Sequence, residues 1–128
     1  MVMKHPMFRL ALVAALTLSP LTVLAHGDTT PKHGGIVQMT GETLIELVAG
    51  ADLASLYVRE DDEPIVSAEF TATMTIMEAA GKRQVDLTPA AGNRFDAPGV
   101  RLTRGAKVAV MVINKASQAR SILSFVIK

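Results

Sequence analysis

Apolar and polar residues alternate along much of the chain after residue 35. In FTATMTIM, residues 70–77, four apolar residues alternate with three threonines and Met77. The same alternation occurs in KVAVMVI at 107–113 and in SILSFVI at 121–127. A period of two is typical of strands with one buried and one solvated face. The pattern therefore predicts three strands, with Met74 on a buried face and Met77 on an exposed one.

Turn residues separate these runs at intervals of about 8–12 residues, which is the spacing of an antiparallel sandwich or barrel. No helical periodicity is sustained after residue 25. We therefore predict an all-β fold, an immunoglobulin-like antiparallel β-sandwich of about seven strands, over residues 36–128. The expected strands are 35–39, 43–49, 53–59, 68–78, 82–88, 93–96, 106–113 and 119–127. The last of these runs nearly to Lys128, which predicts a C-terminus fixed in a sheet.

Residues 1–25 have the pattern of a secretory signal peptide. Lys4 and Arg9 precede an apolar run, and small residues at the end of that run predict cleavage after Ala25. The run is interrupted by Pro20 and is shorter than the roughly 20 apolar residues that span a bilayer. We expect an exported protein that is not inserted in the membrane after processing, with its mature chain beginning at His26.

Composition excludes several classes of function. The chain has no cysteine, so disulfides, thiolate zinc sites and thiol nucleophiles are absent. Removing residues 1–25 takes away two of thirteen basic residues and none of twelve acidic ones, which leaves eleven against twelve. A nearly neutral domain without clustered lysine and arginine is not expected to bind nucleic acid.

The polar segment 26–35 predicts a flexible leader, and it holds both histidines that remain after residue 25, His26 and His33. With cleavage before His26, its α-amine and ring nitrogen chelate a metal, with His33 as a third donor and Asp28 as an added oxygen. Amine and imidazole nitrogens suit Cu(II), Ni(II) or Zn(II). The alternative is a leader that binds no ion.

Two other features carry weaker metal hypotheses. Thioether sulfur binds Cu(I), and Met77 is the methionine expected to be exposed, whereas Met74 is expected in the core. The acidic run 60–63 lacks the glycine and the ligand spacing of a calcium loop. We expect this run to form the solvated tip of a hairpin instead.

Catalysis has little support in the sequence, so we do not expect an enzyme. The chain has no glycine-rich phosphate loop, and a Ser–His–Asp arrangement would need a histidine of the leader. An N-terminal histidine on a β-sandwich also suggests a copper enzyme that cleaves polysaccharide. The mature chain, however, has four Phe and Tyr residues and no Trp, too few for a platform on which sugars stack.

Five segments together carry a resemblance to a known family. KHGG at 32–35, ETLIELVA at 42–49, SLYVREDDEPI at 55–65, VDLTPAAGNRFDA at 85–97 and GAKVAVMV at 105–112 resemble small exported β-sandwich proteins of Gram-negative bacteria. Those proteins are encoded beside heavy-metal cation efflux systems and are related to segments of the periplasmic efflux adaptor subunits. Where the family often places histidine before ELV, this chain has Leu44-Ile45-Glu46.

The resemblance implies a non-enzymatic periplasmic accessory protein of heavy-metal resistance or efflux. Its partner would be a periplasmic component of a cation efflux system, and its cargo a copper or zinc ion held by the N-terminal arm. The alternative is an immunoglobulin-like structural or interaction module with no metal site, which docks through an edge strand.

Overall fold

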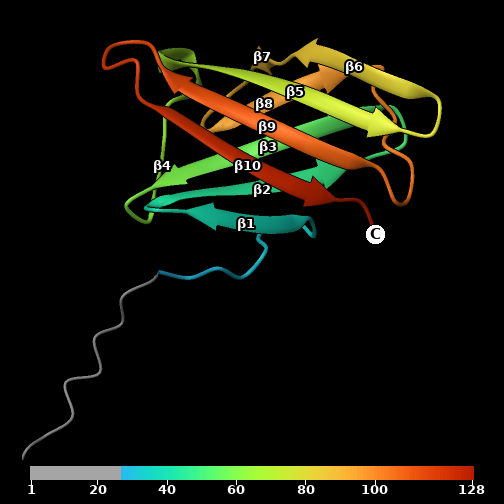
Figure 1. Cartoon of the computed structure of the whole chain (residues 1–128). Helices are drawn as coiled ribbons and strands as arrows, with labels where there is room; N and C mark the ends of the chain where they lie inside the picture. The colour runs from blue at the N-terminus through green and yellow to red at the C-terminus, as the bar shows by residue number, and fades with distance from the viewer. Residues whose placement is uncertain (1–26) are drawn as a thin grey trace, which may run out of the picture.

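A computed structural model describes residues 27–128, which form two antiparallel sheets packed face to face (Figure 1). The predicted signal peptide and His26 lie outside the described residues. The only helical element in the described part is a short 3-10 turn, Ser67–Glu69. The strands are β1 (Ile36–Thr40), β2 (Thr43–Ala49), β3 (Leu53–Glu60), β4 (Glu63–Pro64), β5 (Phe70–Glu78), β6 (Gly81–Asp86), β7 (Thr88–Pro89), β8 (Arg94–Pro98), β9 (Lys107–Asn114) and β10 (Arg120–Val126).

The strand order is that of an immunoglobulin-like sandwich. One sheet has the order β1-β2-β3-β8-β7, with β4 on the end of β3, and the other has the order β10-β9-β5-β6. The series β2-β3-β8-β7 and β6-β5-β9-β10 correspond to strands A-B-E-D and C′-C-F-G of that fold. Strand β1 adds a hairpin partner to β2. The predicted all-β, immunoglobulin-like sandwich is confirmed.

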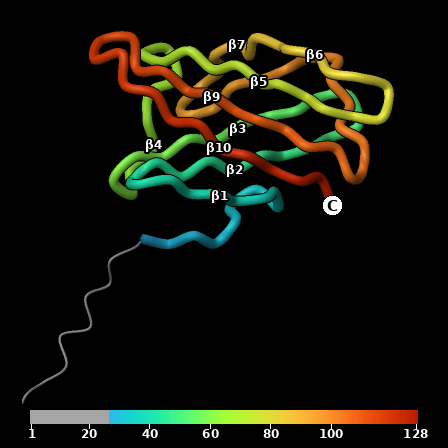
Figure 2. Tube along the Cα trace, viewed as in Figure 1, coloured from blue at the N-terminus to red at the C-terminus, as the bar shows by residue number. Residues whose placement is uncertain are grey.

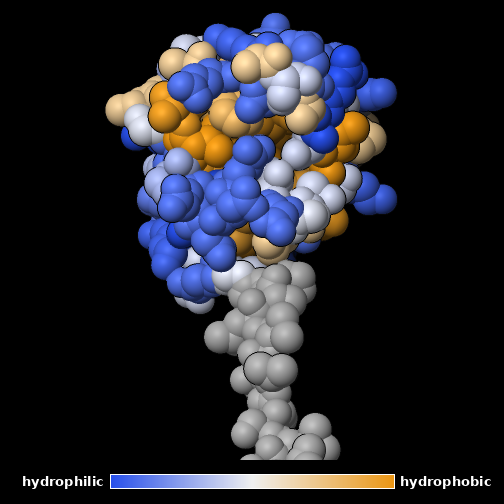
Figure 3. Space-filling view, turned by 90° about the vertical axis from the view of Figure 1, so that its left-hand side faces the viewer, coloured by the Kyte–Doolittle hydropathy of each residue, from blue (hydrophilic) through white to orange (hydrophobic). Residues whose placement is uncertain are grey.

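The two inner faces of the sheets form the core. Antiparallel pairing aligns alternate apolar residues of neighbouring strands, for example Met74 of β5 opposite Val110 of β9. Both are fully buried, as are Leu56 of β3 and Phe95 of β8. Met77 is 40% exposed on the outer face of β5, so the predicted orientation of both methionines is confirmed. Seen from the end that carries the β3–β4 hairpin, most of the surface is polar and apolar residues gather in a band across it (Figure 3).

The acidic run lies at the tip of the β3–β4 hairpin, as expected. Asp61 and Asp62 both adopt positive φ angles, 50° and 64°, which suit the tight two-residue turn of a hairpin. The four residues from Glu60 to Glu63 show their side chains to solvent at least in part. No helix among residues 27–128 is long and apolar enough to cross a membrane.

The C-terminus is fixed in the second sheet, as predicted. Beyond β10, the Ile127 amide donates to the Ala106 carbonyl at 2.9 Å, and the Ile127 carbonyl accepts from the Gly105 amide at 2.7 Å. The side chains of Phe125 and Ile127 are buried. Figure 2 shows the chain ending beside the start of β1, so the first and last described strands are neighbours.

Candidate metal-contact site

A buried carboxylate lies where the leader meets the first sheet. Strand β2 is buried on both faces from Thr43 to Leu47, since Ile45 and Leu47 face the core while segment 28–35 covers part of the other face. Glu46 lies on that second face and is only 2% exposed. A buried ionised residue requires partners, because an unpaired charge is costly away from water.

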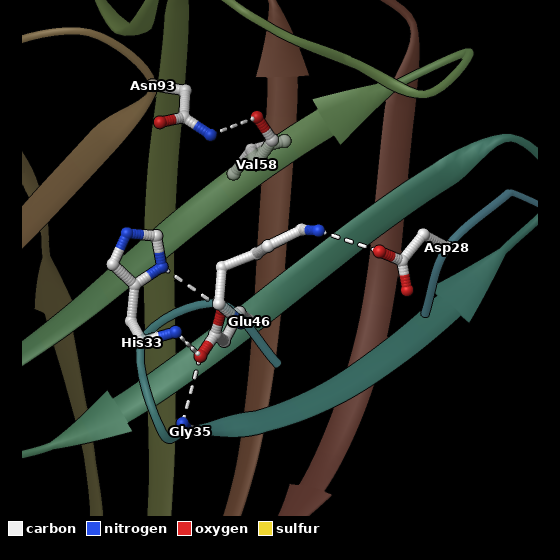
Figure 4. A network of polar contacts seen from close by, with 7 residues as sticks. Asp28, His33, Gly35, Glu46, Val58 and Asn93 are labelled. Carbon is white, nitrogen blue, oxygen red and sulfur yellow. Dashed lines mark hydrogen bonds and ion pairs between the residues drawn. The ribbon is translucent and has the colours of Figure 1, made fainter. Parts of the chain in front are cut away.

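The partners of Glu46 come from the leader (Figure 4). Its Oε1 accepts a hydrogen bond from the Lys32 amide at 2.9 Å. Its Oε2 accepts from the His33 amide at 2.8 Å and from the Gly35 amide at 2.9 Å. The ring of His33 adds a fourth contact, with Nδ1 3.1 Å from Oε1. One carboxylate therefore fixes residues 32–35 to the sheet.

These contacts decide the charge of Glu46. Burial by itself raises its pKa, but the backbone amides of Gly35 and Lys32 and the ring and amide of His33 together lower it by more. The pKa of Glu46 consequently lies below its ordinary value. The group is a carboxylate at neutral pH, and it accepts hydrogen bonds without donating any.

His33 is held in one orientation by two contacts. Its ring lies flat on that of Tyr57, with centroids 3.5 Å apart and planes at 8°. Because the carboxylate of Glu46 only accepts, Nδ1 of His33 carries the proton in the neutral ring, and Nε2 keeps its lone pair. The side chain is 42% exposed. A histidine that donates one ring N–H to a carboxylate and offers the other nitrogen is the arrangement found around bound metals.

The ring borders a small pocket of about 230 Å³. Tyr57 and Arg59 of β3 line it, and Asn93 lies across it, with the Asn93 side-chain amide donating to the Val58 carbonyl at 2.9 Å. Gly35, just before β1, lies so close to β2 that a Cβ there would lie 2.4 Å from the Leu47 carbonyl oxygen. Only glycine fits this close approach, which brings Lys32 and His33 onto the sheet.

The residues proposed from the sequence are only partly brought together. Asp28 lines the same pocket as His33. Its carboxylate, however, accepts from the Lys32 ammonium at 2.6 Å and from the Thr30 amide at 2.8 Å, and these bonds hold its pKa well below its ordinary value. Met77 lines a different groove, beside Lys107. Among residues 27–128 no group of three or more His, Cys, Asp or Glu side chains is arranged to hold a metal.

The structure differs from the sequence-based picture of the leader. Residues 26–35 are expected to be flexible, whereas residues 32–35 are fixed by Glu46 and His33 packs on Tyr57. The sequence interpretation missed the roles of Glu46 and Tyr57. The signal for Glu46 was a lone carboxylate inside the apolar strand TLIELVA, since charged residues are rarely buried without a partner.

We expect the stability of the metal-free protein to depend on the ionisation of Glu46. Because its folded-state pKa is lowered, its contribution is complete above the ordinary glutamate pKa of about 4.3 and is lost as pH falls through the lowered value. Thermal unfolding followed by circular dichroism in the presence of a chelator should show this loss. The Glu46→Gln variant should have a lower midpoint at pH 7 and a flatter dependence below pH 5. Equal slopes for the two proteins would contradict the assignment.

The fold and the site together define a class: an immunoglobulin-like β-sandwich that presents one carboxylate-oriented histidine where its leader joins the first sheet. Comparisons of the chain with models of protein families, with curated proteins and with solved structures found no match.

Proposed function

We propose that this protein is a non-enzymatic periplasmic accessory of heavy-metal resistance or efflux, which holds a copper or zinc ion through His33. The observation that supports the proposal most is the contact of His33 Nδ1 with the buried carboxylate of Glu46. That contact leaves the lone pair of Nε2 for a metal, on a side chain that is 42% exposed, and imidazole nitrogen is a ligand common to both metals.

Glu46 and Tyr57 contribute to this function as positioning residues. Hydrogen bonding to a carboxylate raises the basicity of a metal-binding histidine and fixes its tautomer, which is worth about 10–100-fold in metal affinity. Stacking on Tyr57 holds the ring plane. Both effects reduce the conformational entropy that binding would otherwise cost.

The described residues supply one such donor, so other ligands are required for tight binding. His26 lies seven positions earlier in the sequence, and after cleavage before it both its ring and its α-amine are donors of the same class. In this proposal the sandwich keeps His33 in place, and the ion is captured by His33 and His26 and passed to a component of the efflux system. No covalent chemistry is needed.

Titration calorimetry of the mature protein with Cu(II), Zn(II) and Ni(II) tests the proposal. We expect binding of one ion per chain, which is lost in His33→Ala and weakened in His26→Ala. Intact mass fixes the N-terminus of the sample. Binding should weaken at low pH because imidazole and amine must release protons to bind. Equal affinity of wild type and His33→Ala would contradict the role of His33.

The Glu46→Gln variant distinguishes two roles of Glu46, orienting the ring of His33 and holding the leader on the sheet. The amide NH₂ of glutamine, placed where Oε1 now lies, donates to Nδ1 and therefore favours the tautomer with the proton on Nε2. We expect metal affinity to fall at least tenfold in a protein that still unfolds cooperatively. An unchanged affinity would show that Glu46 acts on the leader alone.

The second candidate is an interaction module without a metal site. The observation that favours it is the pair of sheet edges formed by β1 and β10, which carry no charge other than Arg120 and have no strand partner on their outer side within residues 27–128. Removing residues 26–34 distinguishes the two candidates, since the module predicts that partner binding survives and the metal arm predicts that function is lost.

A further inference from the structure

The two sheets meet along the edges of β1 and β10, and within residues 27–128 these two strands do not pair with each other. Strand β1 pairs only with β2, and β10 only with β9, so one side of each has no strand partner within residues 27–128. Near one end the side-chain hydroxyls of Thr43 and Ser121 join the sheets, with their oxygens 3.0 Å apart. Toward the other end, where β1 begins and β10 ends (Figure 2), the edges border an open groove of about 780 Å³.

The register shows which backbone groups of β10 are free. Both the amide and the carbonyl of Ile127 bond to the segment that leads into β9. Because the direction of these groups alternates along an antiparallel strand, those of Val126, Ser124 and Ile122 point away from β9. They face the side on which β1 and the groove lie. A peptide in extended conformation would find a row of unpaired donors and acceptors there.

The other two sheet edges, β6 and β7, are protected from strand addition, whereas the edges at β1 and β10 are not. Strand β6 carries Lys82 and Arg83, and β7 has two residues, one of them Pro89. Charges, proline and short length are the usual devices that prevent strand addition at an edge. Strand β1 reads IVQMT, and β10 has no charge between Arg120 and the chain end at Lys128. An edge that lacks these devices is suited to receive a strand.

The lining of the groove combines apolar side chains with positive charge. Its apolar lining includes Ile36 from β1 and Phe125 and Ile127 from the C-terminal segment. Its charged side chains are Lys107 and Lys128, both exposed, and none of its lining side chains is acidic. Its volume lies within the range of about 300–1,000 Å³ typical of ligand sites.

We propose that this groove binds an extended segment of a partner protein by strand addition to β10. The segment has apolar residues at alternate positions and an acidic side chain at the end that lies near Lys107 and Lys128. Main-chain hydrogen bonds supply affinity, and the side-chain alternation and the charge supply specificity. The inference rests on the second candidate function and is independent of metal at His33.

Two synthetic ten-residue peptides test it, each alternating valine and threonine, one ending in two aspartates and the other in two lysines. The readout is the amide spectrum of the mature, isotope-labelled protein with a chelator present. We expect the aspartate peptide to shift amides of β1 and β10 and to slow hydrogen exchange at Val126, Ser124 and Ile122. The lysine peptide should bind at least tenfold more weakly.

Two substitutions sharpen the result. Ser124→Pro removes an edge amide that bonds to no other strand among residues 27–128, and should lower affinity at least tenfold while the fold is kept. Lys107→Glu should weaken the aspartate peptide and strengthen the lysine peptide. Its matched control is Arg120→Glu, an equal change of charge at the opposite end of β10, which should leave both affinities nearly unchanged. The charge swap keeps the test valid if the proline variant does not fold.

Three outcomes would overturn the inference. Peptide shifts confined to β6 or β7 would place strand addition elsewhere and leave the interaction module standing. Absence of binding by both peptides at millimolar concentration would refute strand addition altogether. Concentration-dependent dimerisation in sedimentation, with peptide failing to compete, would assign the groove to a second copy of this chain instead of a partner. None of these results bears on metal binding by His33.

Discussion

Removal of residues 124–128 is expected to abolish cooperative folding. The deletion takes Phe125 and Ile127 out of the core, where they are 1% and 6% exposed, and removes the β10 partners of residues 107–109 of β9. Loss of one such large buried side chain typically costs about 2–5 kcal/mol. Two losses approach the whole stability of a domain of this size, which is about 5–15 kcal/mol.

Circular dichroism during heating and the dispersion of amide proton signals measure this effect. The truncated chain should lack a sigmoidal transition and show collapsed amide dispersion. The matched control removes Lys128 alone, whose side chain is exposed, and should melt within a few degrees of the full chain. A cooperative transition in the longer deletion would mean that the two sheets hold together without the end of β10.

The second large effect is expected for Glu46→Ala, which removes the acceptor of three backbone amides and the partner of the His33 ring. Hydrogen bonds to a charged group contribute about 1.5–3 kcal/mol each in buried settings. Because the freed amides of the leader regain water, we expect a net loss of about 3 kcal/mol in the free energy of unfolding. Urea titration measures it.

Limited trypsin digestion gives an independent readout of the same change. The bond after Lys32 is held on the sheet in the native protein because its own N–H, that of His33, and the N–H of Lys32 both donate to Glu46. In Glu46→Ala it should be cleaved much faster than in the native chain under conditions where the sandwich is folded. Asp28→Ala, which removes an exposed partner of the Lys32 side chain, serves as the control and should leave the rate nearly unchanged.

The strands could be predicted from the sequence because the alternation of apolar and polar residues is a local pattern. All eight predicted strands overlap an observed one, and Met74 and Met77 lie on the faces that the pattern indicated. Strands β4 and β7 were missed because each has two residues, too few to show a period. Both exist only through pairing with a longer neighbour.

The site depends on contacts between distant positions, which the local pattern does not contain. The sequence indicated His33 as a donor. It gave no sign that the ring would stack on Tyr57, which lies 24 positions later, or bond to Glu46. Met77, a separate candidate, lies apart from His33, since β5 belongs to the other sheet. A buried carboxylate in an apolar strand was the one usable clue.

The order of the strands also determines when the chain can fold. The inner strand β5 pairs with β9, and β3 with β8. After β3 or β5 has left the ribosome, about 30 or more further residues must therefore emerge before its partner strand is available. Non-local pairing of this kind is slow, and complete all-β domains of similar size fold in milliseconds to seconds. The core residues Phe125 and Ile127 leave a ribosome or a translocation channel after all the strands from β1 to β9. A chain that emerges N-terminus first therefore keeps its apolar strand faces open until β10 has emerged, and has to be protected from aggregation during that interval.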